Sequence, residues 1–291
     1  MARQETETLD NRLRARMEQF TRAERQLAVA MLQDYPATAL GSITALAQRA
    51  DVSAPTVTRM LRKIGLDGFQ AFQEALRAEL SAMAAGPIVK RDSGAAGAPD
   101  SHLLNRFSET VIANLQSTLA NLNPTTFDAS VELLADPERR IYVTGGRITR
   151  SLADYLFTHL QVIRSDVSKL GDAPGVWPHY VLEMKRGDVL VLFDIRRYEN
   201  TLLRLAELAH GRGVDIILFT DQWGSPISKF ANRRFSCNVE APSAWDSSAA
   251  ILLIVEALIA SVQESSWSAT KERMEQLEDI FDSTRLFRKF V

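Results

Sequence analysis

The chain has 291 residues, of which 46% are hydrophobic and 24% charged, and 34 Lys plus Arg against 36 Asp plus Glu give a formal net charge of −2. These values exclude a disordered chain, a collagen-like repeat and a wholly basic nucleic-acid coat protein. The length predicts two domains. The single cysteine, Cys237, excludes an internal disulfide and a cysteine-rich zinc site, which suits a reducing compartment.

Two segments bear on membrane contact. Residues 1–20 lack the apolar core of a secretory signal peptide. The most apolar stretch, residues 249–262, is too short to span a bilayer comfortably and contains Glu256, so we expect a buried helix there. The sequence therefore predicts a cytoplasmic protein without a membrane partner.

The first part of the chain predicts only helices. Thr21 followed by Glu24 forms a capping-box pattern and opens the first helix that the pattern defines. Ser42 and Ser53 are the expected N-caps of the next two helices. A further helix is expected over residues 69–80, so this part of the chain is predicted to be an all-α bundle.

A shift in composition marks the boundary between the two expected domains. Residues 84–101 are rich in Gly, Ala, Pro, Ser and Asp and show no sustained apolar period, which is typical of a linker. We predict a first domain over residues 1–83 and a second over residues 102–263. Residues 264–291 are predicted to form a C-terminal helix.

The second domain alternates between short apolar strands and helical patterns. The strands are expected over residues 141–144, 167–170, 188–193, 214–220 and 235–239, and the helices over residues 103–122, 124–135, 148–163, 176–184, 199–211, 226–232 and 245–262. Such alternation predicts a mostly parallel sheet with helices on both faces. The expected fold of this part is a three-layer α/β sandwich.

Residues 42–65 predict two short helices joined by a tight turn, the arrangement of a helix-turn-helix. Asp51 in the turn tolerates the left-handed conformation, and Pro55 fits the first turn of the second helix. The outer face of that helix carries three positive charges and no acid, which suits the DNA major groove. The candidate DNA-contacting residues are Ser42, Ser53, Ala54, Thr56, Thr58, Arg59, Arg62 and Lys63. A helical bundle with a solvated basic face is the alternative.

Spaced motifs extend through this region. They are Thr21-x-x-Glu24, Ile43-x-x-Leu46-Ala47, Ala50-x-Val52-Ser53, Thr56-Val57-x-Arg59 and Arg62-Lys63-Ile64-Gly65-x-x-Gly68-Phe69. On these residues the segment resembles the N-terminal domain of the RpiR family of bacterial transcriptional regulators. Asp51 departs from the Gly that is usual in that family. The resemblance implies a DNA-binding regulator.

Two polar loops are expected to meet at the carboxyl edge of the sheet. Gly145-Gly146-Arg147 precedes a helix, where free N–H groups attract an anion, and a charged loop follows the third strand. If the strand order is 2-1-3-4-5, both loops face one crevice. The candidate ligand residues in them are Gly145, Gly146, Arg147, Thr149, Ser151, Arg196, Arg197, Asn200 and Thr201. The arginine pair would clamp a phosphate or carboxylate, unless it pairs with Glu183, Glu199 or Asp194 or lies at a subunit interface.

Three segments carry a second resemblance: the strand-Gly-helix region Tyr142 to Ser151, Thr220-Asp221 with Ser225-Pro226-Ile227, and Ser243 to Ser248. On these segments the second part resembles the sugar isomerase (SIS) domain of RpiR-family regulators. The resemblance implies a five-stranded parallel sheet in flavodoxin-like order, phosphosugar binding and dimerisation. It adds Ser243, Asp246 and Ser247 to the candidate ligand residues.

The loop after the third strand departs from that family. The usual Ser-x-Ser-Gly-x-Thr pattern is replaced by Asp194-Ile195-Arg196-Arg197-Tyr198-Glu199, so charge and bulk stand in place of hydroxyls. Three alternatives follow. The arginines hold the anion, the ligand is a different organic acid, or the domain only dimerises.

Together these features predict a dimeric transcriptional regulator whose second domain senses a small anionic metabolite, either a sugar phosphate or a sugar acid. The expected partners are a palindromic double-stranded DNA operator and a second copy of the chain, with pairing of dimers into a tetramer left open. No cofactor, metal site or catalytic residue is predicted, since the four histidines show no metal-ligand spacing.

Two other functions are alternatives. A sugar-phosphate isomerase would need a positioned base, and His179, Glu183 and Glu199 are the candidates, although none forms a recognisable pair. An architectural DNA-binding dimer without an effector would also fit the altered loop, because a fold alone does not fix a function.

Overall fold

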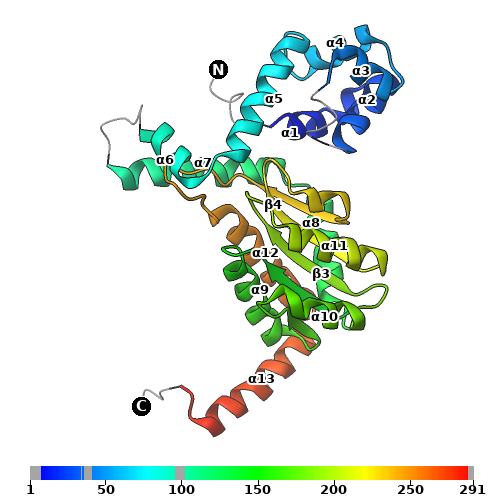
Figure 1. The fold of residues 1–291 in the computed structure, drawn as a ribbon. Coiled ribbons are helices and arrows are strands. Elements are labelled where there is room, and N and C mark those ends of the chain that lie inside the picture. Colours follow the sequence, from blue (N-terminus) through cyan, green and yellow to red (C-terminus); the bar gives the residue numbers. More distant parts are fainter. Residues whose placement is uncertain (1–7, 34, 36–40, 96–101, 288–291) are drawn as a thin grey trace. The chain divides into compact units, whose positions relative to one another are not determined.

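The computed structural model describes residues 8–33, 35, 41–95 and 102–287 (Figure 1). The described chain forms two compact units. One extends to Phe107 and includes Ala241–Trp245, and the other consists of Ser108–Glu240 and the residues from Asp246 onward. Within the described residues the first unit is helical and the second is built on one parallel sheet, which confirms the predicted fold class.

The helical unit is built around one apolar core. Its elements are α1 (Leu9–Ala15), the 3-10 turn η1 (Met17–Gln19), α2 (Arg22–Gln33), α3 (Ile43–Arg49), α4 (Ala54–Lys63), α5 (Phe69–Ala84) and α6 (Pro87–Ala95). Helix α1 was not predicted from the sequence. Its Leu9 and Leu13 are fully buried and belong to the same core cluster as Met60 of α4 and Phe72 of α5. The core of this unit therefore begins upstream of the capping box.

The predicted helix caps are present. The Thr21 N–H donates to the Glu24 carboxylate at 2.8 Å, and the Glu24 N–H donates to the Thr21 hydroxyl at 3.4 Å, which completes the capping box. The Ser42 hydroxyl accepts from the Ala45 N–H at 3.1 Å. Each of these bonds satisfies a backbone donor that a helix start leaves without an intrahelical partner.

The stretch predicted as a linker is partly helical. Helix α6 covers residues 87–95, inside the predicted range of residues 84–101. Residues 96–101 lie outside the described residues. The assignment of a linker and of exact domain boundaries stays a prediction.

The second unit alternates helices and strands. After α7 (Leu103–Asn121) and α8 (Pro124–Ala135) come β1 (Ile141–Gly145), α9 (Arg150–Ile163), β2 (Val167–Lys169), η3 (Pro174–Val176), α10 (Trp177–Glu183), β3 (Val189–Asp194), α11 (Asn200–Gly211), β4 (Asp215–Asp221), η4 (Pro226–Lys229), β5 (Arg233–Cys237), α12 (Ala249–Ser265) and α13 (Trp267–Thr284). All neighbouring strands are parallel, in the order β2-β1-β3-β4-β5. The supposed order of 2-1-3-4-5 is therefore confirmed.

Helices cover the sheet on both faces because side chains alternate along each strand. Leu190 of β3 and Ile216 of β4 stand side by side and belong to a core cluster with Leu202 and Leu205 of α11. Helix α9 packs against β1, β2 and β3, and α12 packs against α8 and α9. All six residues of β3 are buried, as expected for a central strand of a parallel sheet.

Two predicted boundaries near the end of the sheet are wrong. Strand β5 covers residues 233–237 instead of 235–239, and α12 begins at Ala249 instead of residue 245. Residues 241–248 form bends without regular structure, since their polar and Pro-containing sequence favours turns over a helix start. The polar segment is therefore longer than expected.

The apolar stretch near the C-terminus forms α12, whose Ile251, Ile254 and Leu258 are buried. Among the described helices, none is by itself long and apolar enough to cross a membrane. Helices α12 and α13 meet such a criterion only as a pair, and that pair is bent by 99°.

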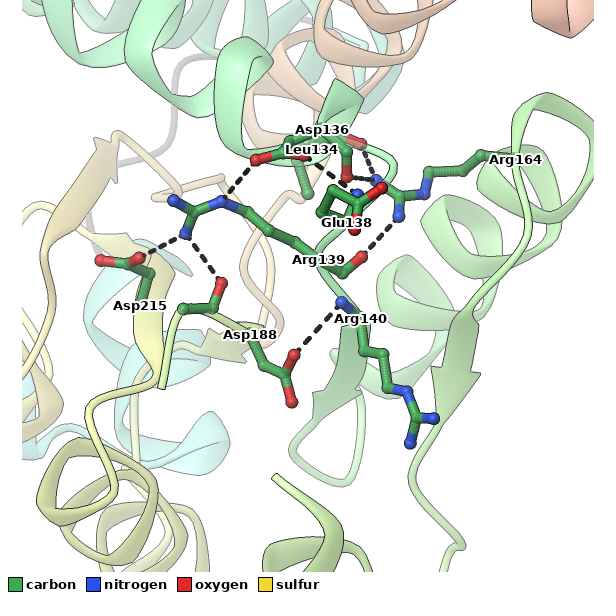
Figure 2. Close-up of polar contacts among 9 residues, drawn as sticks. Leu134, Asp136, Glu138, Arg139, Arg140, Arg164, Asp188 and Asp215 are labelled. Atoms are coloured by element: carbon green, nitrogen blue, oxygen red, sulfur yellow. Dashed lines mark hydrogen bonds and ion pairs between the residues drawn. The ribbon is translucent and has the colours of Figure 1, made fainter. Parts of the chain in front are cut away.

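Arginines hold the amino edge of the sheet together (Figure 2). Arg164 donates to the carbonyl oxygens of Leu134 at 2.8 Å and Asp136 at 2.6 Å, and also to that of Arg139. Arg139 in turn donates to the Gly187 carbonyl at 2.7 Å. These contacts satisfy backbone oxygens where the chain enters the strands, so they are structural.

Candidate DNA-binding and ligand-binding sites

The helix-turn-helix has the predicted geometry. Helices α3 and α4 are joined at Asp51, whose φ of +51° is the left-handed conformation that the sequence predicted for it. The Ser53 hydroxyl accepts from the Thr56 N–H at 3.4 Å, which makes Ser53 the N-cap of α4. Pro55 lies in the first turn of α4, where its missing N–H leaves no bond unmade.

One face of α4 is fixed in the core and the other faces outward. The inward side chains are fully or almost fully buried: Val57, Met60, Leu61 and Ile64. Thr58 is half-buried, and Arg59 and Arg62 are exposed, as the predicted outer face requires. Ser42 and Ser53 are exposed at the starts of α3 and α4. The structure thus presents two guanidinium groups on one exposed helix face.

Thr56 does not belong to that outer face. It is only 7% exposed, and its hydroxyl lies 2.9 Å from the Ser53 hydroxyl and accepts from Arg59 at 3.3 Å. The contact between the two hydroxyls holds the Thr56 side chain against the first turn of α4. Ala54 is half-buried beside it. The prediction of an exposed Thr56 is therefore wrong.

Lys63 has a partner inside the protein. Its Nζ lies 2.7 Å from the Glu24 carboxylate, whose side chain is only 5% exposed, and it also donates to the Gln19 carbonyl at 3.4 Å. Burial favours the neutral form of Glu24, but the hydrogen bonds from Lys63 and Thr21 lower the pKa of this carboxyl overall. Lys63 therefore links the end of α4 to the start of α2.

The two loops predicted to form the ligand site do meet at the carboxyl edge of the sheet. The Glu199 carboxylate accepts the Arg147 N–H at 2.7 Å, and the Thr149 hydroxyl donates to the Phe193 carbonyl at 2.7 Å. The Gly146 N–H also donates to the Phe193 carbonyl, at 3.1 Å. The adjacency follows from the pairing of β1 with β3.

Arg196 is held by carboxylates of this unit. Its Nε lies 2.6 Å from the Asp246 carboxylate, and its Nη2 lies 3.8 Å from that of Glu240. The guanidinium also stacks over the Trp223 ring, 4.1 Å from its centroid. The side chain is only 8% exposed, so Arg196 acts as a buried anchor of the loop. The arginine pairs that the sequence suggested, with Glu183, Glu199 or Asp194, are not the ones found for Arg196.

The buried carboxylate of Asp221 fixes the loop that contains Arg196. Asp221 accepts from the Arg196 N–H at 2.6 Å, the Tyr198 hydroxyl at 2.7 Å and the Trp223 and Gly224 N–H groups at 3.0 and 3.2 Å. Burial raises the pKa of Asp221, and these donors oppose that shift. They fix a loop in which Arg196 and Arg197 both have positive φ, 27° and 56°, a strained conformation for residues with side chains.

Asp194 is the most unusual acid at this edge. It is 2% exposed and contacts the Ser225 hydroxyl through one oxygen, while the other accepts the Glu199 N–H at 3.3 Å. Burial raises the pKa of Asp194 to about 6, partly opposed by the bonds from Ser225 and Glu199. The group can therefore change its charge near neutral pH.

The remaining candidate ligand residues differ in accessibility. Arg147, Arg197, Asn200 and Thr201 are exposed, and the Ser151 hydroxyl donates to the Ile148 carbonyl at 3.0 Å. The Ser247 N–H donates to the Val239 carbonyl at 2.7 Å, while its hydroxyl accepts the Ala249 N–H at 3.3 Å. Ser243 lies in the segment grouped with the first unit, where its hydroxyl accepts the Trp245 N–H at 3.1 Å. Their roles in ligand binding stay predictions.

Sequence reasoning missed three residues of this edge. Trp223 and Asp221 were not predicted to hold the arginine loop, and Glu199 was weighed only as a partner of arginine side chains or as a base. The run Thr220-Asp221-Gln222-Trp223 could have predicted these contacts. An acid and an aromatic residue at the end of a buried strand lie close to the loop that follows the neighbouring strand.

Comparison with known proteins identifies both parts of the chain. Residues 7–83 match the family model "Helix-turn-helix domain, rpiR family", and residues 133–261 match the model "SIS domain". The regulator HexR of Pseudomonas aeruginosa is 29% identical over 220 residues, 75% of this chain and 74% of that protein. HexR of Escherichia coli strain K12 is 24% identical over 232 residues, 78% of this chain and 77% of that protein. Both are named HTH-type transcriptional regulators.

Solved structures share the fold. The Vibrio vulnificus NanR protein complexed with ManNAc-6P has a TM-score of 0.55 at 21% identity and covers 97% of this chain and 100% of its own. The sugar isomerase domain of an RpiR transcription factor from Sphaerobacter thermophilus has a TM-score of 0.57 at 18% identity, with 62% and 99% covered. Fold and matched segments together define a helix-turn-helix transcriptional regulator with an SIS domain. Residues 7–83 carry the helix-turn-helix domain of the rpiR family, as the sequence motifs indicated, and residues 133–261 carry the SIS domain.

Proposed function

We propose that this regulator binds a palindromic operator as a homodimer in the cytoplasm and senses a small anionic metabolite at the carboxyl edge of its sheet. The observation that carries the DNA-binding part is the exposed α4 face with Arg59 and Arg62, set on an ordered α3–α4 turn. Two such faces related by a two-fold axis would match two half-sites. Whether dimers pair further is an outcome of the same experiments.

The effector part is supported by the meeting of the two loops. Parallel α/β sheets bind ligands at the carboxyl ends of their strands, and here Arg147, Arg197 and Asn200 are exposed beside that edge. The NanR structure named above contains a sugar phosphate, which is the ligand class that we propose here first. Ligand binding would then change DNA affinity, as linkage between two sites requires.

The first experiment measures fluorescence anisotropy of the full chain with DNA flanking its own gene and with scrambled DNA, at about 50 and about 200 mM salt. We expect selective binding that weakens with salt, and then a change in affinity when a sugar phosphate is added. Equal, weak binding to both DNAs would contradict the proposal and reopen the isomerase alternative. Light scattering on the same protein tests the dimer.

Arg59→Ala tests the α4 face directly. If Arg59 contacts a base, its loss should cost roughly 1–3 kcal/mol of operator affinity. Arg77→Ala removes the same charge from an exposed position on α5 and serves as the control. Operator binding by Arg59→Ala that equals the control would remove Arg59 from the interface.

Lys63→Met separates two roles for Lys63. If its main contact is Glu24, the free energy of unfolding should fall by about 1 kcal/mol. An ion pair with one buried partner stabilises the fold more than a fully exposed pair does. If Lys63 binds a DNA phosphate, the salt dependence of binding should lose about one unit of slope instead. Urea unfolding and the anisotropy assay at two salt concentrations measure the two effects independently.

A further inference from the structure

The carboxylate of Glu199 occupies a backbone donor that an anion would use. It accepts the Arg147 N–H at 2.7 Å, in the turn between β1 and α9. Its other oxygen lies 3.5 Å from the Thr201 hydroxyl. Backbone N–H groups in a Gly-rich turn after a strand are a common anion site, and here one of them already holds a negative charge.

The turn is shaped to admit this carboxylate. A Cβ placed on Gly146 would lie 2.9 Å from the Glu199 Oε1, and a Cβ on Gly145 would lie 2.8 Å from the Thr149 carbonyl oxygen. A side chain at residue 146 would thus push Glu199 away. The glycine makes room for a negatively charged group directly against the turn.

Arg196 does not offer a better anion position. Arg196 is paired with Asp246 at 2.6 Å and stacked on Trp223, so an incoming anion would have to compete with a buried ion pair. Arg147 and Arg197 are exposed, and their guanidinium groups can follow an anion that enters the turn. Glu199 is therefore the charged group that already occupies the backbone donor of the turn.

We infer that Glu199 is an internal competitor of the ligand, so that an anionic effector binds by displacing this carboxylate from the Arg147 N–H. The inference rests on the proposed effector site and makes Glu199 a specificity-determining residue of it. A ligand carboxylate would have to displace the Glu199 carboxylate, which has the same chemistry and is held at the turn by the chain at a high effective concentration. A free carboxylate therefore gains little by the exchange. A phosphate monoester carries more charge and three strong acceptor oxygens. The site therefore selects phosphate esters over sugar acids.

The test uses inorganic phosphate and acetate as probes of the full chain at pH 8 and constant ionic strength. Dissociation constants come from the rise in Tm with probe concentration. In the parent we expect phosphate to bind weakly and acetate to give no shift. In Glu199→Gln we expect phosphate to bind about tenfold more tightly and acetate to become measurable, because the competitor has lost its charge.

Glu207→Gln is the matched control. Glu207 lies on α11, the helix that Glu199 precedes, and its carboxylate pairs with Arg204 at 2.8 Å instead of with the turn. This variant makes the same change of charge eight residues further along the chain, and its dissociation constant for phosphate should equal that of the parent. Glu199→Asp keeps the charge but shortens the side chain, so its dissociation constant for phosphate should lie between those of the parent and Glu199→Gln. It also checks that the effect of Glu199→Gln does not come from the amide group itself.

The outcomes separate this inference from the proposed function. Equal phosphate constants in parent, Glu199→Gln and Glu207→Gln would overturn the role of Glu199 and leave the effector site standing. Phosphate binding to none of the variants would overturn both the role of Glu199 and the anion-sensing part of the proposed function. Operator binding by the same preparations, measured by anisotropy, decides the DNA-binding part independently.

Discussion

Both edges of the sheet carry arginines, but Arg164 at one edge and Arg196 at the other bind different acceptors. At the amino edge, Arg164 donates to three backbone carbonyl oxygens, and Arg139 donates to a fourth and to the carboxylates of Asp136 and Asp215 (Figure 2). At the carboxyl edge, Arg196 pairs with the Asp246 side chain, and the Glu199 side chain covers the Arg147 N–H. A backbone carbonyl oxygen moves only when the chain moves, whereas a carboxylate side chain can rotate away and leave its donor to a ligand. The difference supports the proposal that the effector binds at the carboxyl edge.

Removing Arg164 should have the largest effect. Arg164→Met leaves three partly buried carbonyl oxygens without their charged donor, and we expect the free energy of unfolding to fall by about 3–4 kcal/mol. Urea unfolding measures it. Arg204→Met, at an exposed surface pair, should cost less than about 0.5 kcal/mol. A loss at Arg164 no larger than at Arg204 would mean that the amino edge is not held by this side chain.

Asp194 should make the carboxyl edge sensitive to pH. Its pKa is raised by burial from the ordinary 3.8 to about 6, so the folded state binds the proton more tightly than the unfolded state. The stabilisation from protonated Asp194 is fully present below about pH 4 and is lost as pH rises through 6, an effect of about 2–3 kcal/mol.

Asp194→Asn should remove that share of the pH dependence. We expect the difference in unfolding free energy between variant and parent to shift in favour of the variant from pH 4 to pH 7, measured by urea unfolding at each pH. Asp128→Asn, at an exposed position on α8, is the control and should show no such trend. The same trend in both variants would assign the effect to net charge instead of to burial.

Breaking the Arg196 anchor should have a smaller effect on stability. Arg196→Met keeps the stem but abandons Asp246 and the Trp223 ring, and we expect a loss of about 2 kcal/mol with a change in tryptophan fluorescence. Arg197→Met, at the exposed neighbour, should stay within about 0.5 kcal/mol of the parent. If the two variants were equally stable, the carboxyl-edge arginines would not differ in the way that their burial indicates.

The sheet was predictable because its strands are strong local signals. The runs that form β3 and β4 are continuous and apolar, and their alternation with helices leaves few topologies for a parallel sheet. The turn before α4 was predictable for the same reason, since Ser53 and Pro55 act within one helical turn. Local chemistry of this kind does not depend on distant partners.

The contacts of the carboxyl edge were less predictable because they join residues far apart in the sequence. Arg196 and Asp246 are 50 residues apart, and Arg147 and Glu199 are 52 apart. Sequence pattern places their loops at one edge but does not tell which carboxylate reaches which donor. The prediction of an exposed Thr56 was wrong for a related reason. Helical spacing put it on the outer face, and the contact with the nearby Ser53 hydroxyl holds its side chain against the first turn of α4.

Helix α1 has a consequence for how this protein could be cut or joined to others. The motifs that identify the helix-turn-helix begin at Thr21, yet Leu9 and Leu13 fill the core beneath them, and the Leu9 N–H donates to Glu79 at 2.6 Å. A gene fusion that began at Thr21 would lack Leu9 and Leu13, and the transferred helical unit would have a cavity in its core. The intact unit therefore begins upstream of Thr21, in a segment that the helix-turn-helix family model also matches.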